Sequence, residues 1–436
     1  MLRWISQKLA MSAVPRPKVI VIAGTTGVGK SQLSIQLASR VSGEVINSDS
    51  MQVYKDIPII TNKHPIEERE NVAHHVMNHV SWDEEYFLHR FEKECLNAIK
   101  DIHSRGKIPI IVGGTHYYLQ ILLEKRIEKK TRALLPEEQA ILDSNEPHQL
   151  YSMLKEVDPD IASKYHPNDI RRVRRMLEIY FTTGQKPSQA FSEQKQSLVF
   201  DTLFLWVYSS PEVLEGRLDK RVDAMMESGA LNEIRQLHEY YNSCNYSVDK
   251  CENGVWQVIG FKEFLPWLEN ADGSSFCDSV DRMKVRTRQY AKKQVKWIKK
   301  MLLPDVKSHL YALDATDLNH WDENVSQRAF SIADSFISNR IIEEPFVPPS
   351  LEDVVKNNDT ESNSPKTAGD WSRQQCDICR DKDDNPLVAI GEKSWNIHLK
   401  SRRHRSNLSR IKKRENLELW KKKKAKEICA DEKEAV

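Results

Sequence analysis

The sequence predicts an α/β fold in which a P-loop NTPase-like parallel sheet carries an inserted helical subdomain and a small C-terminal zinc finger. Three observations lead to this prediction: short apolar runs that each end in a loop, a glycine-rich loop between the first run and a helical pattern, and a Cys/His quartet near the C-terminus. The chain has 436 residues, which suggests two or three domains, at least one of them with a full core.

Composition excludes two broad classes of protein. The chain is 39% hydrophobic and 29% charged, and no apolar run approaches the length of a membrane span, so we expect no membrane role. Its 7 cysteines are scattered, with one C-x-x-C pair, which argues against a secreted disulfide framework. We therefore expect a reducing compartment.

The net charge of +2 conceals three basic clusters. One lies between Arg282 and Lys300, one between Lys393 and Lys426, and the third consists of Arg171, Arg172, Arg174 and Arg175. Each could be a solvated helix face. Together they favour a polyanionic partner such as nucleic acid.

Residues 1–17 form a possible targeting segment. They carry basic and apolar residues and no acid, which is typical of a mitochondrial presequence. A start at Met11 would remove most of this segment, so products for the mitochondrion and the cytoplasm are conceivable. An unstructured tail is the alternative.

Residues 18–117 are predicted to form the P-loop α/β core. The apolar run VIVIA reads as a buried strand, the loop GTTGVGKS follows, and SQLSIQLASR has helical periodicity. Backbone N–H groups and a lysine in such a loop surround phosphate oxygens, and the final serine can hold a divalent cation. The loop residues are Gly24, Thr25, Thr26, Gly27, Val28, Gly29, Lys30 and Ser31. A diphosphate fits this loop as well as a triphosphate.

The other strands make a nucleotide hydrolase or kinase less favoured. Such an enzyme needs a strand that ends in a metal-holding aspartate, but IPIIV ends in Gly113-Gly114-Thr115. Asp49, after the run EVIN, could replace the missing acid. A P-loop kinase or NTPase therefore stays open as an alternative.

The rest of the chain divides by composition. Residues 118–199 carry helical patterns and no clear strand, so we expect an inserted helical subdomain there. The run TLFLWVY returns the chain to the sheet, and residues 200–340 complete the core and a helical region. Residues 341–370 have linker composition, and residues 371–426 hold the finger and a basic tail.

The C-terminal quartet is spaced as a zinc site. Cys376-x2-Cys379-x18-His398-x5-His404 can close a tetrahedral Zn²⁺ site with no open position, which indicates a structural role. The 18-residue spacing exceeds that of DNA-reading fingers. Chance clustering is the alternative. Residues 421–424, all lysine, could serve as a nuclear import signal.

Several motifs in order resemble the tRNA isopentenyltransferase family, especially its eukaryotic tRNA dimethylallyltransferase branch. They are GTTGVGKS, DSMQVYK, GGTHYYLQ, NDIRRVRRMLE, RLDKRVDAMMESGALNEI, IGFKEF and TRQYAKKQVKW, and they span most of residues 18–300. The finger resembles the matrin or U1 type found on eukaryotic members. A zinc-finger RNA-binding protein whose α/β body is inactive is a further alternative.

The resemblance implies transfer of a dimethylallyl group from dimethylallyl diphosphate to N6 of the adenosine 3′ of the anticodon, position 37, in tRNA. The products would be N6-isopentenyladenosine and diphosphate. The implied partners are dimethylallyl diphosphate and the tRNA anticodon loop, with Mg²⁺ assisting. The helical insertion at 118–199 and the helical region within 200–340 would bind the tRNA. We expect a monomer.

The resemblance also implies roles for single residues. Asp49 matches the catalytic aspartate and Thr115 the threonine at the reacting centre; both would contact the tRNA. Arg217 and Arg221 match arginines that close over the diphosphate bound by the P-loop. The segment that receives the flipped adenosine is Ser50, Met51 and Gln52, and the cluster Arg171, Arg172, Arg174 and Arg175 would hold the backbone of the anticodon loop.

Overall fold

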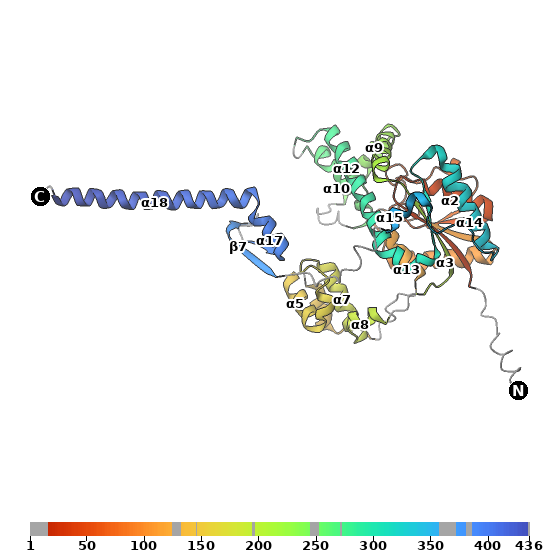
Figure 1. Cartoon of the computed structure of the whole chain (residues 1–436), viewed down its shortest axis with the longest axis horizontal. Helices are drawn as coiled ribbons and strands as arrows, with labels where there is room; N and C mark the ends of the chain where they lie inside the picture. The colour runs from red at the N-terminus through yellow and green to blue at the C-terminus, as the bar shows by residue number, and fades with distance from the viewer. Residues whose placement is uncertain are drawn as a thin grey trace. The chain divides into compact units, whose positions relative to one another are not determined.

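The computed structural model of the chain contains two compact units (Figure 1). The sheet unit comprises Met1–Arg126 with Lys195–Asn363, and the second unit comprises Ile127–Gln194 with Ser364–Val436. The structure describes residues 16–123, 132–144, 146–193, 197–244, 253–270, 273–356, 372–380 and 386–434.

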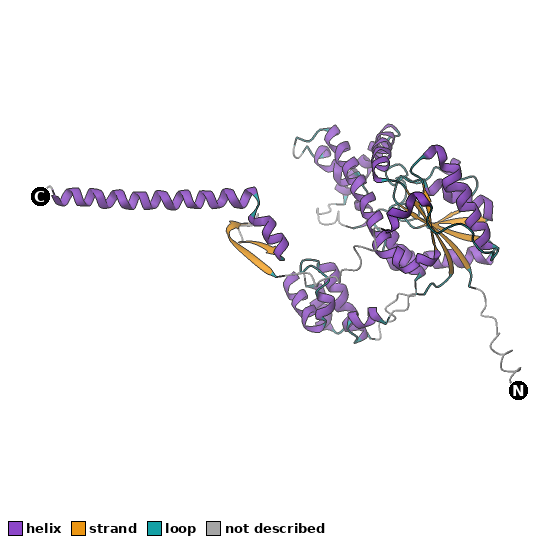
Figure 2. Cartoon of the chain, viewed as in Figure 1, coloured by secondary structure: helices purple, strands orange, loops and turns teal. Residues whose placement is uncertain are grey.

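The sheet unit is built on a six-stranded parallel sheet in the order β3-β2-β4-β1-β5-β6. Figure 2 shows these strands at the centre of the unit with helices around them. The strands are β1 (Lys18–Gly24), β2 (Gly43–Asn47), β3 (His74–His75), β4 (Ile108–Val112), β5 (Asp201–Tyr208) and β6 (Leu310–Asp314). This confirms the predicted α/β fold.

Burial on both faces explains why the strands are continuous apolar runs. Side chains alternate across a strand, so Val19 and Val21 of β1 enter one core cluster while Ile20 and Ile22 enter the other. Both sets are essentially without solvent exposure. A parallel sheet covered on both faces leaves its functional residues at the carboxyl ends of the strands.

Helices pack around the sheet and make up most of the rest of the sheet unit. The α-helices are α2 (Lys30–Val41), α3 (Leu88–Ser104), α9 (Pro211–Glu227), α10 (Ala230–Ser243), α11 (Phe261–Leu268), α12 (Phe276–Trp297), α13 (Leu303–Val306), α14 (Arg328–Ile337) and α15 (Glu352–Lys356). Short turns of 3-10 helix are η1 (Ile66–Glu68), η2 (His116–Leu122), η4 (Gly254–Gln257), η6 (Lys307–His309), η7 (Leu318–His320) and η9 (Pro349–Leu351), and π-helical turns are η5 (Ile298–Leu302) and η8 (Asp322–Gln327).

The second unit contains the predicted helical insertion and finger. Its elements are α4 (Pro136–Asp143), α5 (Pro147–Val157), α6 (Pro159–Ala162), α7 (Ile170–Thr183), α8 (Pro187–Ser192), the antiparallel pair β7 (Arg373–Arg380) and β8 (Pro386–Ile390), α17 (Glu392–Leu399) and α18 (Arg402–Glu434). The insertion has its own apolar core, to which α5 and α7 contribute Leu150, Leu154, Val173 and Leu177.

The insertion is shorter than the predicted 118–199. Tyr118 stacks on Phe91 with ring centroids 4.2 Å apart and belongs to the core of the sheet unit. Leu123 pairs with Leu198 in an isolated bridge, and both residues belong to the sheet unit. The sequence boundary was wrong because the aromatic-rich turn η2 has no strand pattern.

The linker prediction of 341–370 is wrong over residues 341–356. Phe346 lies against Tyr311 with ring centroids 4.8 Å apart, and its carbonyl accepts a hydrogen bond from Ala312 N at 2.8 Å. Leu351 is 3% exposed. A few apolar anchors therefore fix a segment whose composition is that of a linker, while residues 357–370 lie outside the described residues.

The predicted targeting segment falls on residues of which only 16 and 17 are described. Among the helices that the structure describes, none is long and apolar enough to cross a membrane.

Candidate functional site

The P-loop connects β1 to α2 at the carboxyl end of the sheet. Gly27 and Gly29 have φ angles of 83° and 86°, a left-handed backbone conformation that residues other than glycine rarely adopt. Lys30 begins α2 and its Nζ donates to Thr25 O at 2.6 Å. The loop thus has the strand, turn and helix start that surround phosphate oxygens.

Asp49 lies in a fixed turn after β2. The amide of Asn47 accepts from Asp49 N and donates to Asp49 O, both at 3.0 Å, and Asn47 is 1% exposed. One Asp49 carboxylate oxygen accepts from Met51 N at 2.9 Å. The second oxygen is therefore the one left to face a substrate in this turn.

Thr115 follows β4 and lies beside the Asp49 turn. Its hydroxyl accepts from Ser50 N at 3.0 Å and donates to Ser50 Oγ at 3.1 Å. A Cβ at Gly113 would lie 2.3 Å from the Ser48 carbonyl carbon, and one at Gly114 would lie 3.3 Å from an Asp49 oxygen. Only glycines let the two loops approach, so the structure brings Asp49 and Thr115 together.

Two cations face one carboxylate across this site. Arg221 Nη1 donates to the Thr26 hydroxyl at 2.9 Å, next to the P-loop backbone. Burial lowers the pKa of Lys30 to about 8 and that of Arg221 to about 10, and the charge of Asp49 opposes both shifts. Partly buried cations with little compensating negative charge favour an anionic ligand.

Arg217 does not join Arg221 at the P-loop. Its guanidinium donates to Ala315 O at 2.6 Å and to Thr316 O at 2.5 Å, in the loop that follows β6. The spacing of four residues placed both arginines on one helix face, but it could not specify that α9 passes between two different loops.

A cavity of about 240 Å³ opens from the P-loop and the Asp49 turn. Its described lining residues are Thr26, Asp49, Ser50, Met51, Ile60, Thr61, Arg221, Val222, Met225, Gln257, Val258, Ile259, Met283, Arg286, Thr287, Tyr290 and Lys293. The lining includes Ser50 and Met51 but not Gln52, whose amide donates to Thr61 O and Asn62 O at 3.3 and 3.0 Å. Apolar side chains such as Met51, Val258 and Met283 line part of the cavity, and polar or charged side chains line the rest, which suits a ligand that has both apolar and charged parts.

Sequence reasoning missed Gln294, which connects the two loops of the site. Its amide accepts from Thr26 N and donates to Gly114 O, both at 2.9 Å, and it is 4% exposed. Tyr290, one helical turn earlier on α12, lines the cavity and donates to Gly114 O at 3.4 Å. The spacing Tyr-x3-Gln was a usable signal, but it lies inside the basic cluster between Arg282 and Lys300, which we interpreted as a surface for a polyanionic partner.

His116 is a second missed residue. Its ring is buried, contacts the backbone of Gly24 through Nε2, and stacks on Trp297 with centroids 5.8 Å apart. Burial, with a contribution from the charge of Lys30, lowers the pKa of His116 to about 3. A neutral imidazole therefore joins the end of β1 to the Thr115 loop.

Two buried hydroxyls at the site have no hydrogen-bond partner among the described residues, those of Thr25 and Ser48. Buried polar atoms are rarely left unpaired. Their position in the P-loop and beside Asp49 fits a site that is completed by a polar ligand.

The arginines of α7 lie in the second unit. Arg171, Arg172 and Arg175 are exposed, with Arg172 paired to Asp169 at 3.1 Å and Arg175 to Glu178 at 2.6 Å. Arg174 donates to Ser144 O at 3.0 Å.

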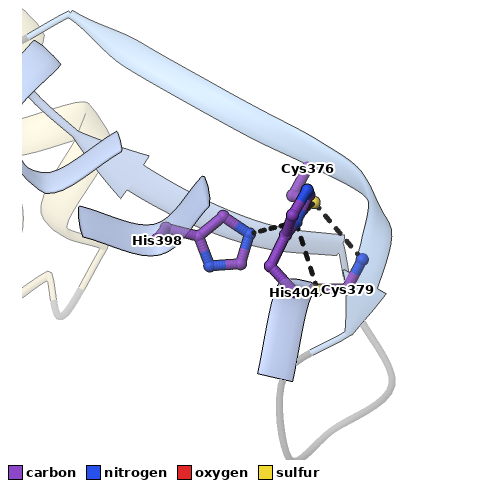
Figure 3. Close-up of side chains that lie close together, drawn as sticks. All are labelled: Cys376, Cys379, His398 and His404. Carbon is purple, nitrogen blue, oxygen red and sulfur yellow. Dashed lines mark hydrogen bonds between the residues drawn. The ribbon is translucent and has the colours of Figure 1, made fainter. Parts of the chain in front are cut away.

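The Cys/His quartet converges in the finger (Figure 3). The ligand atoms of Cys376, Cys379, His398 and His404 lie within 4.8 Å of one another. His404 Nδ1 is 3.5 and 3.7 Å from the two sulfurs and 3.2 Å from His398 Nε2. Tetrahedral Zn²⁺ with Zn–S of about 2.3 Å and Zn–N of about 2.05 Å needs S–N edges of about 3.6 Å and N–N edges of about 3.3 Å. The three distances from His404 Nδ1 match this geometry.

Comparisons with known proteins find relatives over most of the chain. The IPP transferase family matches residues 52–301. A tRNA dimethylallyltransferase of Saccharomyces cerevisiae is 61% identical over 93% of this chain and 95% of its own length, and one of Schizosaccharomyces pombe is 41% identical over 90% and 95%. A crystal structure of a eukaryotic dimethylallyltransferase acting on tRNA superposes with a TM-score of 0.80 at 61% identity, over 93% of this chain and 100% of that one.

Proposed function

Because the chain belongs to the IPP transferase family of tRNA dimethylallyltransferases, we propose that it transfers the dimethylallyl group of dimethylallyl diphosphate to N6 of adenosine 37 in a tRNA anticodon loop. One observation carries the assignment of the site. The P-loop, Asp49 and Thr115 border a single cavity or lie beside it, so a donor diphosphate, a base and an acceptor adenosine can meet there.

Asp49 acts as the base. The N6 lone pair is delocalised into the adenine ring, so the amine attacks C1 of the prenyl group only if its proton is accepted as the C–N bond forms. The Asp49 carboxylate takes this proton. The turn held by Asn47 fixes the carboxylate before substrate arrives, which lowers the entropic cost of the reaction.

Thr115, Lys30 and Arg221 stabilise the leaving group. As the C1–O bond breaks, the bridging oxygen gains negative charge and diphosphate departs. The Thr115 hydroxyl can turn from Ser50 to donate to that oxygen, while Lys30 and Arg221 hold the other phosphate oxygens. Each contact strengthens as charge develops, so these residues act on the rate.

The cavity holds the prenyl group and the flipped base. Met51, Ile259 and Met283 supply apolar surface, and extrusion of adenosine from its stack exposes N6 to Asp49. Arg286 and Lys293 lie on the same lining and would contact phosphates on either side of the flipped nucleotide. The exposed arginines of α7 contact the backbone of the anticodon loop.

A divalent cation fits the donor site. Ser31 would hold Mg²⁺, which supplies positive charge to the diphosphate, and the unpaired hydroxyl of Thr25 is a further polar group for the donor. The finger would hold structural Zn²⁺ through Cys376, Cys379, His398 and His404, giving an accessory contact to tRNA. We propose a monomer present in mitochondrion and cytoplasm, with nuclear entry through the lysine-rich tail.

The assay uses labelled dimethylallyl diphosphate, ATP and an unmodified tRNA. Label in tRNA supports the transferase, phosphate release from ATP supports a kinase or NTPase, and tRNA binding alone supports an inactive RNA-binding protein. Asp49→Ala and Thr115→Ala should each lower kcat by about 10²–10⁴-fold and leave tRNA binding intact. Asp83→Ala, an exposed carboxylate outside the cavity, is the matched control. Full prenylation by Asp49→Ala would show that another group is the base.

A further inference from the structure

Trp321 covers the P-loop on the side of Gly29. A Cβ built on Gly29 would lie 2.5 and 2.7 Å from the indole carbons Cη2 and Cζ3. Gly29 immediately precedes Lys30, so the indole lies on the backbone from which the phosphate-binding helix begins. The cavity is lined instead by Thr26 of this loop and by Arg221 of α9.

The segment that carries Trp321 is fixed on both sides. Before it, Thr316 accepts from Ser210 N at 3.1 Å through its hydroxyl, and the Arg217 guanidinium holds the carbonyl of the same residue at 2.5 Å. After it, Ser326 Oγ donates to Gln36 of α2 at 3.2 Å. These contacts account for Arg217, which the donor site does not use.

Hydrogen bonding by the indole nitrogen does not explain the position of Trp321. Trp321 Nε1 is buried and has no hydrogen-bond partner among the described residues. An indole that was only filling the core could turn this donor toward solvent or a carbonyl, since buried tryptophans usually find a partner. The ring packs against the core cluster of Ile20 and Ile22 as well as against Gly29, so its placement follows from apolar contact and shape.

We propose that Trp321 determines donor specificity by filling the space in which the nucleoside of a nucleotide would lie beside the P-loop. A nucleotide needs room for its ribose and base beyond the phosphates, whereas dimethylallyl diphosphate needs one exit, which the cavity provides. An indole and a purine are both flat bicyclic rings. Removal of Trp321 would thus leave a gap of the shape of a base. The proposal rests on the proposed binding of diphosphate by the P-loop.

The test measures inhibition of prenyl transfer by inorganic diphosphate and by ADP, each against dimethylallyl diphosphate, using the full chain. In the wild-type protein the inhibition constant of ADP should be at least about tenfold higher than that of diphosphate. In Trp321→Ala the inhibition constant of ADP should fall about tenfold or more, while that of diphosphate changes by less than about threefold. Trp321→Phe should give an intermediate value, and Trp82→Ala, which removes an indole remote from the P-loop, should match the wild type.

Several outcomes would overturn the proposal. In the wild-type protein, ADP could inhibit as strongly as diphosphate does. This comparison needs no variant. ADP inhibition could also be equal in all variants, as expected if its adenosine entered the acceptor cavity. If Trp321→Ala does not fold, Trp321→Leu keeps apolar packing and must show the same gain. Failure of diphosphate to compete in every variant would overturn the proposed donor site, and this proposal with it.

Discussion

Gln294→Leu tests whether the connection between the P-loop and the Thr115 loop positions the reacting groups. The substitution keeps much of the side-chain volume but removes both amide hydrogen bonds, to Thr26 N and Gly114 O. Thr26 N can regain a partner from the donor phosphates, whereas Gly114 O keeps only the longer hydrogen bond from Tyr290 at 3.4 Å. We expect the variant to lose about 1–3 kcal/mol of folding free energy, because the buried Gly114 carbonyl loses the shorter of its two hydrogen bonds.

The kinetic effect should exceed the effect on stability. A loss of that size lowers Tm by a few degrees, about 2–4 °C per kcal/mol for a body of this size. Thr115 follows Gly114 directly, and a displacement of about 1 Å at a reacting centre costs about 10²-fold in rate. We therefore expect kcat to fall about 100-fold while KM for dimethylallyl diphosphate changes by less than about tenfold.

The assay is steady-state transfer of labelled prenyl group to a tRNA transcript, with thermal unfolding measured on the same preparation. Gln289→Leu makes the same chemical change on the exposed face of α12 and should leave kcat and Tm unchanged. A Gln294→Leu variant with lowered Tm and kcat within about threefold of the wild type would refute the reasoning. In that case Gln294 would stabilise the fold without positioning Thr115.

Three further predictions concern charge and metal. Above about pH 8, kcat/KM for dimethylallyl diphosphate should fall about tenfold per pH unit, because Lys30 loses its proton there; Lys30→Arg should abolish this fall, and a profile flat to pH 9.5 would contradict it. Arg221→Met should lower kcat/KM about 10–100-fold with Tm nearly unchanged, whereas Arg217→Met should lower Tm with smaller kinetic effect; equal kinetic losses would show that both bind the donor. Cys376→Ser should abolish zinc retention, measured by metal emission, and weaken tRNA binding across a salt series without changing kcat at saturating tRNA; unchanged affinity would rule out the accessory role of the finger.

The sequence predicted those parts of the site that depend on local geometry. Gly27 and Gly29 indicate the P-loop because any other residue would be strained in a left-handed turn. The finger ligands have a spacing that a tetrahedral site requires. The apolar strands were visible because both faces of a parallel sheet are buried. In each case the physical constraint acts between neighbours in the chain.

Contacts between distant segments were not predictable in this way. Gln294 meets Thr26 across 268 positions, and Arg217 meets Thr316 across 99. Nothing in a helical pattern specifies which loop a helix passes. The two arginines four residues apart were therefore predicted to share one role, whereas they contact two different loops. Trp321 was missed for the same reason, since it follows β6 whereas the residue it contacts, Gly29, lies in the loop after β1.

In the proposed mechanism, the three charged groups of the donor site act together because their charges interact. The charge of Asp49 opposes the lowering of the pKa of Lys30 and of Arg221, so Asp49 would compete with the diphosphate for the same cations before reaction. When Asp49 accepts the N6 proton, its charge would disappear, and the cations would be free to meet the charge that develops on the departing diphosphate. Proton acceptance would therefore assist loss of the leaving group, and loss of the leaving group would favour proton acceptance. A carboxylate near two partly buried cations would in this way couple the two halves of the proposed transfer.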